Sequence, residues 1–425
     1  MTGAPATENL ASLLQSRAVP LEVLHRDYGP LMELVRTLIG VVPNCDRYLE
    51  IWPPAFRTYN LVVPNLMNLP AAIFGLGGAP KALVGLSMLV ASRTAECPYC
   101  TAHTCSFALR RGASAQTVAA ALLGRDGLAP EEAAVVAVAR SLGRVPCEIT
   151  PRERQDLERF FPPQQAEWIA MGAIAMGFLN KFMDAIGVEL ESSTVAEVRE
   201  TLGADWSPGG AGWNLDPESA APAAPPPADS WREKLRILPQ LPTALALDRR
   251  WQKGVPSRWP QAGDYLRQHT GHAFPILGRL LNPRCLRAIT TVLTLNLDPA
   301  QCNVSRETKI LAGTIFATVI GDDALAEDLA ALARAHGVDS RRLEEARAYA
   351  GGADLDLAPR DGQEKALMVL ARAASSSPAQ VDREVVETCR RVSLPPEAII
   401  ELVCWLSVLQ LLHRLTAYHR AGDEN

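Results

Sequence analysis

Residues 91–112, ASRTAECPYCTAHTCSFALRRG, place three cysteines and one histidine within nine positions of a chain that uses both residue types sparingly. Pro98 suits the first turn of a helix, so Cys97 would stand directly before that helix. The helix is predicted to end at Gly112, because a basic pair precedes it and glycine adopts the left-handed closing conformation. The stretch therefore predicts a helix with a cysteine at its N-terminus.

Cys97 and Cys100 form a C-x-x-C pair at the start of this helix. Free N–H groups and the positive end of the helix dipole lower the pKa of a thiol there, and the thiolate is the nucleophile. Cys100 follows three residues later on the same face, so a disulfide between the two is expected to form and break. His103 lies three residues further on, where an imidazole exchanges protons with a reacting thiol. The spacing predicts a redox-active pair with a proton relay.

Two other interpretations of the cluster stay open. The C-x-x-C pair could supply half of a zinc site with His103 and Cys105, although Cys105 lies on a different side of the helix from Cys100. Alternatively, the cysteines only fill the core as small apolar residues. No second C-x-x-C, no G-x-G-x-x-G after a strand and no Walker loop occurs in the sequence. We therefore favour redox use and expect neither a metal nor another cofactor.

The composition is that of a soluble globular protein with room for two domains. The chain has 425 residues, of which 48% are hydrophobic and 21% charged. A net charge of -5 disfavours nucleic acid and acidic membranes as partners. The longest apolar runs are shorter than the roughly 20 residues that a spanning helix needs, and they are interpreted as core helices. No signal-peptide pattern is present, and nine scattered cysteines suit a reducing compartment, so we expect a cytoplasmic location.

Residues 207–230, SPGGAGWNLDPESAAPAAPPPADS, are rich in proline, alanine and glycine and predict an interdomain linker. On both sides of it, apolar residues recur at three and four positions, and helix starts such as the capping box of Thr150 and Glu153 are present. No run of β-branched residues alternates as a strand would. The sequence predicts an all-α fold with one domain over residues 1–206 and a second over residues 231–425.

Comparison of the two predicted domains reveals an internal repeat. Residues 88–114 align with residues 313–339, and the double proline before residue 164 aligns with Pro395 and Pro396. Three helices in the same order predict two copies of one helical domain. The C-x-x-C pair and its histidine fall opposite Asp322, Leu325 and Asp328. We therefore expect the site in the first copy only, with a degenerate second copy.

The stretch at 91–112, with the apolar helix KALVGLSMLV before it, resembles the active-site segment of the alkylhydroperoxidase D-like (AhpD-like), carboxymuconolactone decarboxylase-like superfamily. The shared features are a serine five residues before the first cysteine, a C-x-Y-C motif containing Tyr99, a histidine, and a helix that ends in glycine. Residues 177–191, GFLNKFMDAIGVELE, resemble the closing helix of the peroxidase-related members. The resemblance is specific over about residues 60–195. It implies an all-helical, usually oligomeric fold whose cysteine pair reduces hydroperoxides or exchanges electrons with a protein disulfide.

The resemblance also implies roles for single residues. Cys100 would attack the substrate, Cys97 would resolve, and His103 would belong to the proton relay. The helix-dipole argument instead favours Cys97 as the attacking thiol, so both assignments stay open. Thr104 occupies the position at which family members place the histidine.

Family members also carry a glutamate twelve residues before the first cysteine, where this chain has Gly85. Glu96 could replace that glutamate if its loop folds back, and Asp184 could do so if the closing helix packs over the site. The missing glutamate indicates a weak or altered peroxidase.

Three functions follow from these observations. The first is a thiol-dependent peroxidase or dithiol–disulfide oxidoreductase. Its substrate would be a small hydroperoxide, its reductant a dithiol or a protein disulfide reductant, and its assembly a homo-oligomer. The second is a lactone decarboxylase, whose family members do not depend on a C-x-x-C pair. The third is a non-catalytic redox sensor or scaffold. Three other histidines and the six other cysteines are interpreted as core or surface residues: His269, His272, His413, Cys45, Cys147, Cys285, Cys302, Cys389 and Cys404.

Overall fold

The computed structural model describes residues 8–124, 126–209, 215–216, 230–353 and 362–423. Within these residues the chain forms 21 α-helices, three short 3-10 helices and a single pair of two-residue strands. The expectation of an all-α fold is confirmed, and the small strand pair is an addition that the sequence did not predict.

The N-terminal half contains most of the elements that surround the cysteine pair. In chain order these are α1 (Leu10–Leu14), η1 (Gln15–Arg17), α2 (Leu21–Ile39), α3 (Cys45–Leu49), α4 (Pro53–Leu66), η2 (Ala71–Phe74), α5 (Lys81–Thr94), α6 (Pro98–Arg110), α7 (Ala115–Leu123), α8 (Pro130–Gly143), α9 (Pro151–Phe160), α10 (Pro163–Ile186), β1 (Leu190–Glu191) and α11 (Ser192–Leu202).

The C-terminal half follows after β2 (Leu215–Asp216) and is entirely helical over its described residues. Its elements are α12 (Trp231–Ile237), α13 (Leu241–Trp251), α14 (Gln261–Thr270), η3 (Pro275–Arg279), α15 (Pro283–Leu297), α16 (Arg306–Ile320), α17 (Asp323–Ala335), α18 (Ser340–Ala350), α19 (Gly362–Ser375), α20 (Arg383–Arg391) and α21 (Pro396–Arg420).

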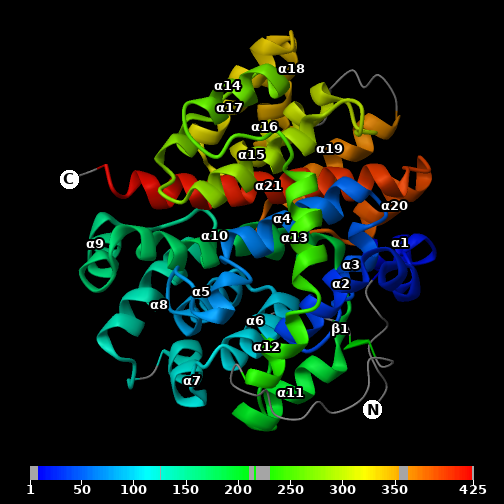
Figure 1. Cartoon of the computed structure of the whole chain (residues 1–425). Coiled ribbons are helices and arrows are strands. Elements are labelled where there is room, and N and C mark those ends of the chain that lie inside the picture. The colour runs from blue at the N-terminus through cyan, green and yellow to red at the C-terminus, as the bar shows by residue number, and fades with distance from the viewer. Residues whose placement is uncertain (1–7, 125, 210–214, 217–229, 354–361, 424–425) are drawn as a thin grey trace.

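The two longest helices, α10 and α21, pack against each other at the centre of the molecule (Figure 1). Most helices of the N-terminal half lie on one side of this pair and most of the C-terminal half on the other, while α12 and α13 lie beside the N-terminal half. Both are long and apolar enough to cross a membrane, and 94% and 100% of their apolar windows are buried inside the protein. A Cβ atom on Gly177 would lie 2.9 Å from the carbonyl oxygen of Gln410, so this close approach requires glycine. One hydrophobic core therefore runs through both halves.

The helices from α4 to α10 are matched in order and length by those from α15 to α21. The first seven have 14, 14, 13, 9, 14, 10 and 24 residues, and the second seven have 15, 15, 13, 11, 14, 9 and 25. The two long helices also begin alike, each at the second residue of a double proline. In α6 and α17 the N-cap side chain, Cys97 or Asp322, accepts an N–H from three residues further on.

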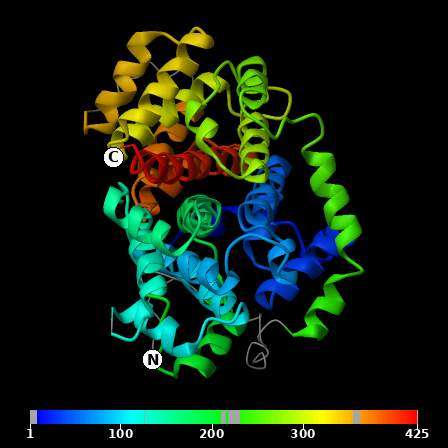
Figure 2. The same cartoon turned by 60° about the vertical axis from the view of Figure 1, so that its left-hand side comes forward.

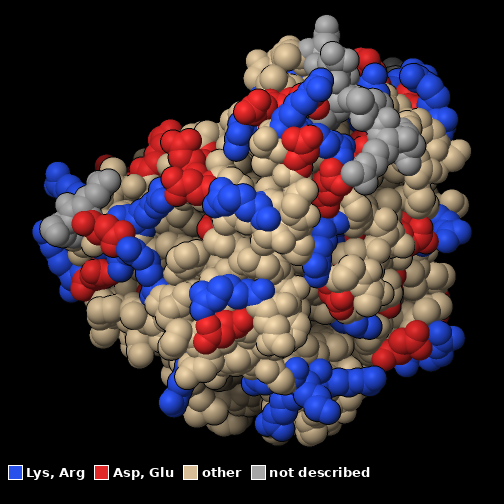
Figure 3. Space-filling view, turned by 90° about the horizontal axis from the view of Figure 1, so that it is seen from above, with Lys and Arg blue, Asp and Glu red and all other residues tan. Residues whose placement is uncertain are grey.

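Part of the predicted linker returns to the N-terminal half. Leu215 and Asp216 pair in parallel with Leu190 and Glu191 of β1, while residues 210–214 and 217–229 of that segment lie outside the described part of the chain. Helices α12 and α13 then run along the outside of the molecule (Figure 2). On the face seen in Figure 3, basic and acidic side chains are interspersed.

Candidate functional site

The cysteine pair lies at the buried start of α6. The Cys97 sulfur accepts the backbone N–H of Cys100 at 3.4 Å, so the free N–H groups of the first turn face this sulfur. Both cysteines are free thiols, with 1% and 4% of their surface exposed. Burial and the neighbouring Cys97 sulfur raise the pKa of Cys100 well above its ordinary value. The Cys100 thiol therefore needs a base to take its proton before it can react as a nucleophile.

A buried glutamate holds the histidine of the motif. His103 Nε2 lies 2.7 Å from Glu191 Oε2, and the Tyr99 hydroxyl donates to Glu191 Oε1 at 3.0 Å. The backbone N–H of Asn44 also donates to this carboxylate. Only 2% of Glu191 is exposed, so these hydrogen bonds replace its hydration. A carboxylate on Nε2 fixes the proton of the neutral imidazole there and leaves Nδ1 as an acceptor.

Glu191 was not identified from the sequence, although it is the last residue of the stretch at 177–191. Helix α10 ends before Gly187, whose φ of 72° lets the chain turn back into β1 and direct Glu191 to α6. At the family position, a Cβ atom on Gly85 would lie 2.8 Å from the Cα atom of Ala108. The close packing of α5 on α6 therefore leaves no room for a glutamate at residue 85.

Among the described residues, the other predicted supporting residues, Glu96, Thr104 and Asp184, make no hydrogen bond to His103 or Glu191, although Thr104 lines the same cavity as His103. Glu96 is exposed and has a φ of 55°. Thr104 donates to the carbonyl oxygen of Cys100 at 2.6 Å, a hydrogen bond within α6. Asp184 accepts the backbone N–H of Ala379, which belongs to the C-terminal half. Tyr99 alone of these supporting residues contacts Glu191.

A cavity of about 80 Å³ lies next to α6 and reaches Cys100, Tyr99 and His103, whereas Cys97 does not line it. Most of its lining is aliphatic, aromatic or methionine, and no Lys, Arg, Asp or Glu side chain lines it. His103 Nδ1 is buried and has no hydrogen-bond partner among the described residues. The cavity thus brings the thiols of Cys45 and Cys100 together with His103 in an apolar space that suits an uncharged ligand.

Further buried titratable groups lie behind the relay. Asp46 is fully buried, and neither of its carboxylate oxygens has a hydrogen-bond partner among the described residues. Burial, together with the charges of Glu191 and Glu50, raises the pKa of Asp46 well above its ordinary value. Burial therefore favours the neutral acid form of Asp46. The described residues contain no group of three or more His, Cys, Asp or Glu side chains that could hold a metal ion.

The C-terminal half covers the start of α6. The amine of Lys181 donates to the carbonyl oxygen of Ser375 at 3.1 Å and also to that of Ser376, and the Ser377 hydroxyl donates to that of Ala95 at 3.5 Å. Burial lowers the pKa of Lys181 to about 7. The segment between α19 and α20 therefore lies over the turn that leads into Cys97.

In the C-terminal half, Asp322 stands at the position that the sequence aligns with Cys97, and it lies 2.6 Å from His413 Nδ1. His413 Nε2 accepts the backbone N–H of Cys147 at 3.0 Å, so this histidine is a hydrogen-bonded core residue. Asp328, opposite His103, lies 2.7 Å from His272 Nε2, a contact that the sequence analysis did not anticipate.

Comparisons with known proteins give a similarity to two solved structures. No protein-family model matches the chain, and no curated protein matches it. The crystal structure of the debrominase Bmp8 in its apo form has a TM-score of 0.38 and 19% identity, and it covers 47% of this chain and 100% of that one. The structure of a cysteine-to-alanine variant of Bmp8 in complex with 2,3,4-tribromopyrrole has a TM-score of 0.37 and 19% identity, covering 46% of this chain and 98% of that one. The structural similarity thus extends over about half of the chain.

Proposed function

We propose that this chain is a tandem-duplicated protein of the AhpD-like superfamily and that Cys97 and Cys100 form a thiol-dependent peroxidase or dithiol–disulfide centre. The observation that carries the proposal is the apolar cavity shared by Cys100 and His103, with Glu191 behind the imidazole. The matched order and lengths of the helices before and after the linker support the duplication. The second copy, with Asp322 at the position of Cys97, is then degenerate.

The first step is the attack of Cys100 on a hydroperoxide. Cys100 is assigned as the attacking thiol because it lines the cavity and Cys97 does not. His103 Nδ1 takes the thiol proton, and Glu191 stabilises the resulting imidazolium. The sulfur bonds to the terminal peroxide oxygen, the O–O bond breaks, and the alkoxide leaves as an alcohol with the proton from His103. Cys100 is then a sulfenic acid.

The second step closes the disulfide. The Cys97 thiol loses its proton, its sulfur attacks the Cys100 sulfur, and the Cys100 hydroxyl leaves as water with that proton. A dithiol or protein disulfide reductant then returns two electrons and two protons to the pair. Because the C-terminal half covers Cys97, a small dithiol is favoured over a protein as the reductant. A cytoplasmic location and a homo-oligomeric assembly remain predictions.

The other two functions fit the site less well. A decarboxylase acting on a carboxylated lactone needs cations for its substrate, and no Lys or Arg side chain lines the cavity. A redox sensor is favoured by one observation, the burial of both thiols beneath the C-terminal half. Steady turnover separates the peroxidase from the redox sensor, because a sensor is oxidised once and then stops reacting.

The experiment is a measurement of hydroperoxide consumption in excess dithiothreitol by the native chain, Cys97→Ser and Cys100→Ser. The peroxidase proposal predicts many turnovers per native chain, and in Cys100→Ser a consumption no faster than that of a Cys97→Ser, Cys100→Ser double variant. One equivalent consumed, followed by arrest with dithiothreitol still in excess, would replace it by the sensor. No consumption by the native chain would reject both.

A further inference from the structure

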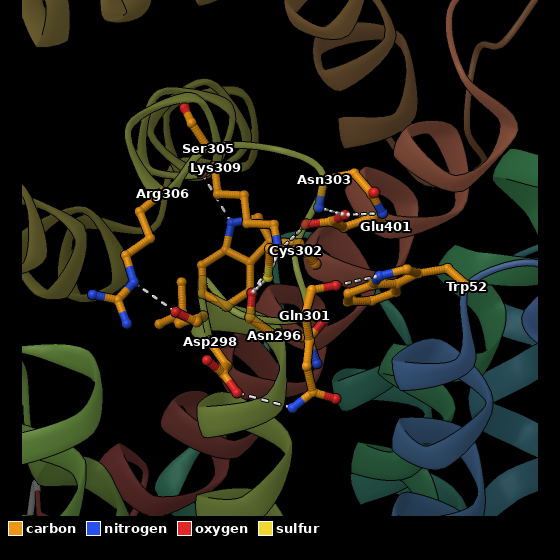
Figure 4. Close-up of polar contacts among 12 residues, drawn as sticks. Trp52, Asn296, Asp298, Gln301, Cys302, Asn303, Ser305, Arg306, Lys309 and Glu401 are labelled. Atoms are coloured by element: carbon orange, nitrogen blue, oxygen red, sulfur yellow. Dashed lines mark hydrogen bonds and ion pairs between the residues drawn. The ribbon is translucent and has the colours of Figure 1, made fainter.

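A second cluster of reactive side chains lies away from the cavity, where the loop between α15 and α16 faces α21 (Figure 4). Cys302 belongs to the loop, Lys309 to α16 and Glu401 to α21. The Lys309 amine donates to the Cys302 sulfur at 3.0 Å and lies 2.6 Å from Glu401 Oε1. It also donates to the carbonyl oxygen of Asn296. The three N–H groups of the ammonium are thus used by a thiol, a carboxylate and a carbonyl.

The cluster is rigid and only partly open. The side chains of Lys309 and Glu401 are both 0% exposed, while Cys302 is half-buried. The Trp52 ring packs over the ammonium, 5.2 Å from its centroid, and Asn303 donates two N–H groups to Glu401 Oε2. The amine is therefore held beside a cysteine that is only partly buried.

We propose that Cys302 and Lys309 form a redox modification site at which a hydroperoxide produces a reversible sulfur–nitrogen crosslink. In the first step, Cys302 takes the terminal oxygen of the hydroperoxide and becomes a sulfenic acid, while the rest of the hydroperoxide leaves as an alcohol or water. In the second step, the Lys309 nitrogen attacks the sulfenyl sulfur, an S–N bond forms, and water leaves. Overall the thiol and the amine lose two hydrogens, and the hydroperoxide is reduced.

Glu401 makes the second step compatible with burial. The ammonium has to lose a proton before its nitrogen can attack, and the carboxylate at 2.6 Å is placed to accept it. The ion pair is then replaced by a neutral sulfenamide and a neutral carboxylic acid, so no unpaired charge remains in the interior. A free thiol returns when a dithiol attacks the S–N bond at sulfur and the amine leaves.

Burial raises the pKa of Cys302 to about 11, against the opposing effect of the Lys309 ammonium. Because the thiolate reacts faster than the thiol, we expect the crosslink to form faster as the pH rises from neutral.

Cys147 is the matched comparison, since it is the other half-buried cysteine and its backbone N–H contacts a histidine rather than an amine.

The test is peptide mapping of the full chain after treatment with hydrogen peroxide at mildly alkaline pH. After trypsin without reductant, we expect residues 288–306 to be joined to residues 307–334, with cleavage after Lys309 blocked and the mass of the pair lower by two hydrogens. Dithiothreitol should release both peptides. The crosslink should be absent from Cys302→Ser and Lys309→Arg, and it should persist in Cys147→Ser.

Two results would overturn the inference. One is oxidation of Cys302 to sulfenic or sulfinic acid with normal cleavage after Lys309, and the other is a Cys302 that stays reduced while Cys147 is oxidised. Because the mapping uses the native chain, it stands even if Lys309→Arg does not fold. The crosslink should also form in a Cys97→Ser, Cys100→Ser double variant, which separates this site from the proposed peroxidase centre.

Discussion

Replacement of Glu191 by glutamine tests the proton relay most sharply. The glutamine oxygen can still accept from Tyr99 and from the backbone of Asn44, so the local packing is retained. Its amide group would instead face His103 Nε2 as a donor, which shifts the imidazole proton to Nδ1. Nδ1, the nitrogen that we propose takes the thiol proton, would then be unable to accept it.

The expected loss follows from the geometry. A buried hydrogen bond of 2.7 Å to a charged carboxylate contributes about 2 kcal/mol, which corresponds to a roughly thirty-fold slower reaction of Cys100. We would measure the second-order rate constant for loss of thiols with tert-butyl hydroperoxide, under pseudo-first-order conditions, across the neutral pH range. Glu191→Gln should be slower throughout that range.

Glu197→Gln is the matched control. Glu197 is also a buried glutamate against α6, but it pairs with Arg110 at 2.8 Å and accepts from Ser106 instead of contacting His103. Its replacement should lower the free energy of unfolding and leave the rate constant unchanged. Equal rate constants and pH profiles for Glu191→Gln and the native chain would refute the assignment of Glu191 to the relay.

Three further predictions concern the buried acid, the central helix pair and the cavity. The raised pKa of Asp46 means that its side chain binds a proton more tightly in the folded than in the unfolded chain, so the free energy of unfolding falls as the pH rises above the unfolded pKa. In denaturant titrations, Asp46→Asn should therefore gain stability relative to the native chain by up to about 1.4 kcal/mol per pH unit. A difference between the two proteins that stays constant with pH would contradict this. Gly177→Ala would place a Cβ atom 2.9 Å from the Gln410 carbonyl oxygen and should lower the free energy of unfolding by roughly 1–3 kcal/mol in thermal unfolding. The control Gly362→Ala, whose Cβ atom would have its nearest contact at 3.4 Å, should lower it little, and equal losses in the two variants would be evidence against tight packing of α10 on α21. Leu179→Phe narrows the cavity and should slow the reaction with cumene hydroperoxide about tenfold more than the reaction with hydrogen peroxide in stopped-flow assays. An equal effect on both reactions would mean that the substrate does not enter the cavity.

Local signals in the sequence predicted the elements around the cysteines well. Helix α6 begins at Pro98, directly after Cys97, because proline and the N-cap sulfur act within one turn. The capping box at Thr150 and the double prolines before α10 and α21 likewise begin helices where the sequence indicated. These features depend on neighbours only three or four residues apart, so the chain order alone reveals them.

Contacts between distant segments could not be predicted in this way. Glu191 reaches His103 only because the turn at Gly187 and the pairing of β1 with β2 bring it back to α6. The Lys181 amine donates to the carbonyl oxygens of Ser375 and Ser376, and these hydrogen bonds join opposite halves of the chain. Nothing in the local pattern around Lys181 distinguishes it from a surface lysine, and its burial depends on the packing of both halves.

The central claim is that Cys100, facing the cavity, is the thiol that hydroperoxides oxidise. The most direct measurement is dimedone labelling of Cys97→Ser and Cys100→Ser after one equivalent of tert-butyl hydroperoxide, with the labelled peptide identified by mass spectrometry. The account predicts a sulfenic acid trapped on Cys100 in Cys97→Ser, no label on Cys97 in Cys100→Ser, and a Cys97–Cys100 disulfide in the native chain. A label on Cys97 in Cys100→Ser, with Cys100 unlabelled in Cys97→Ser, would contradict it.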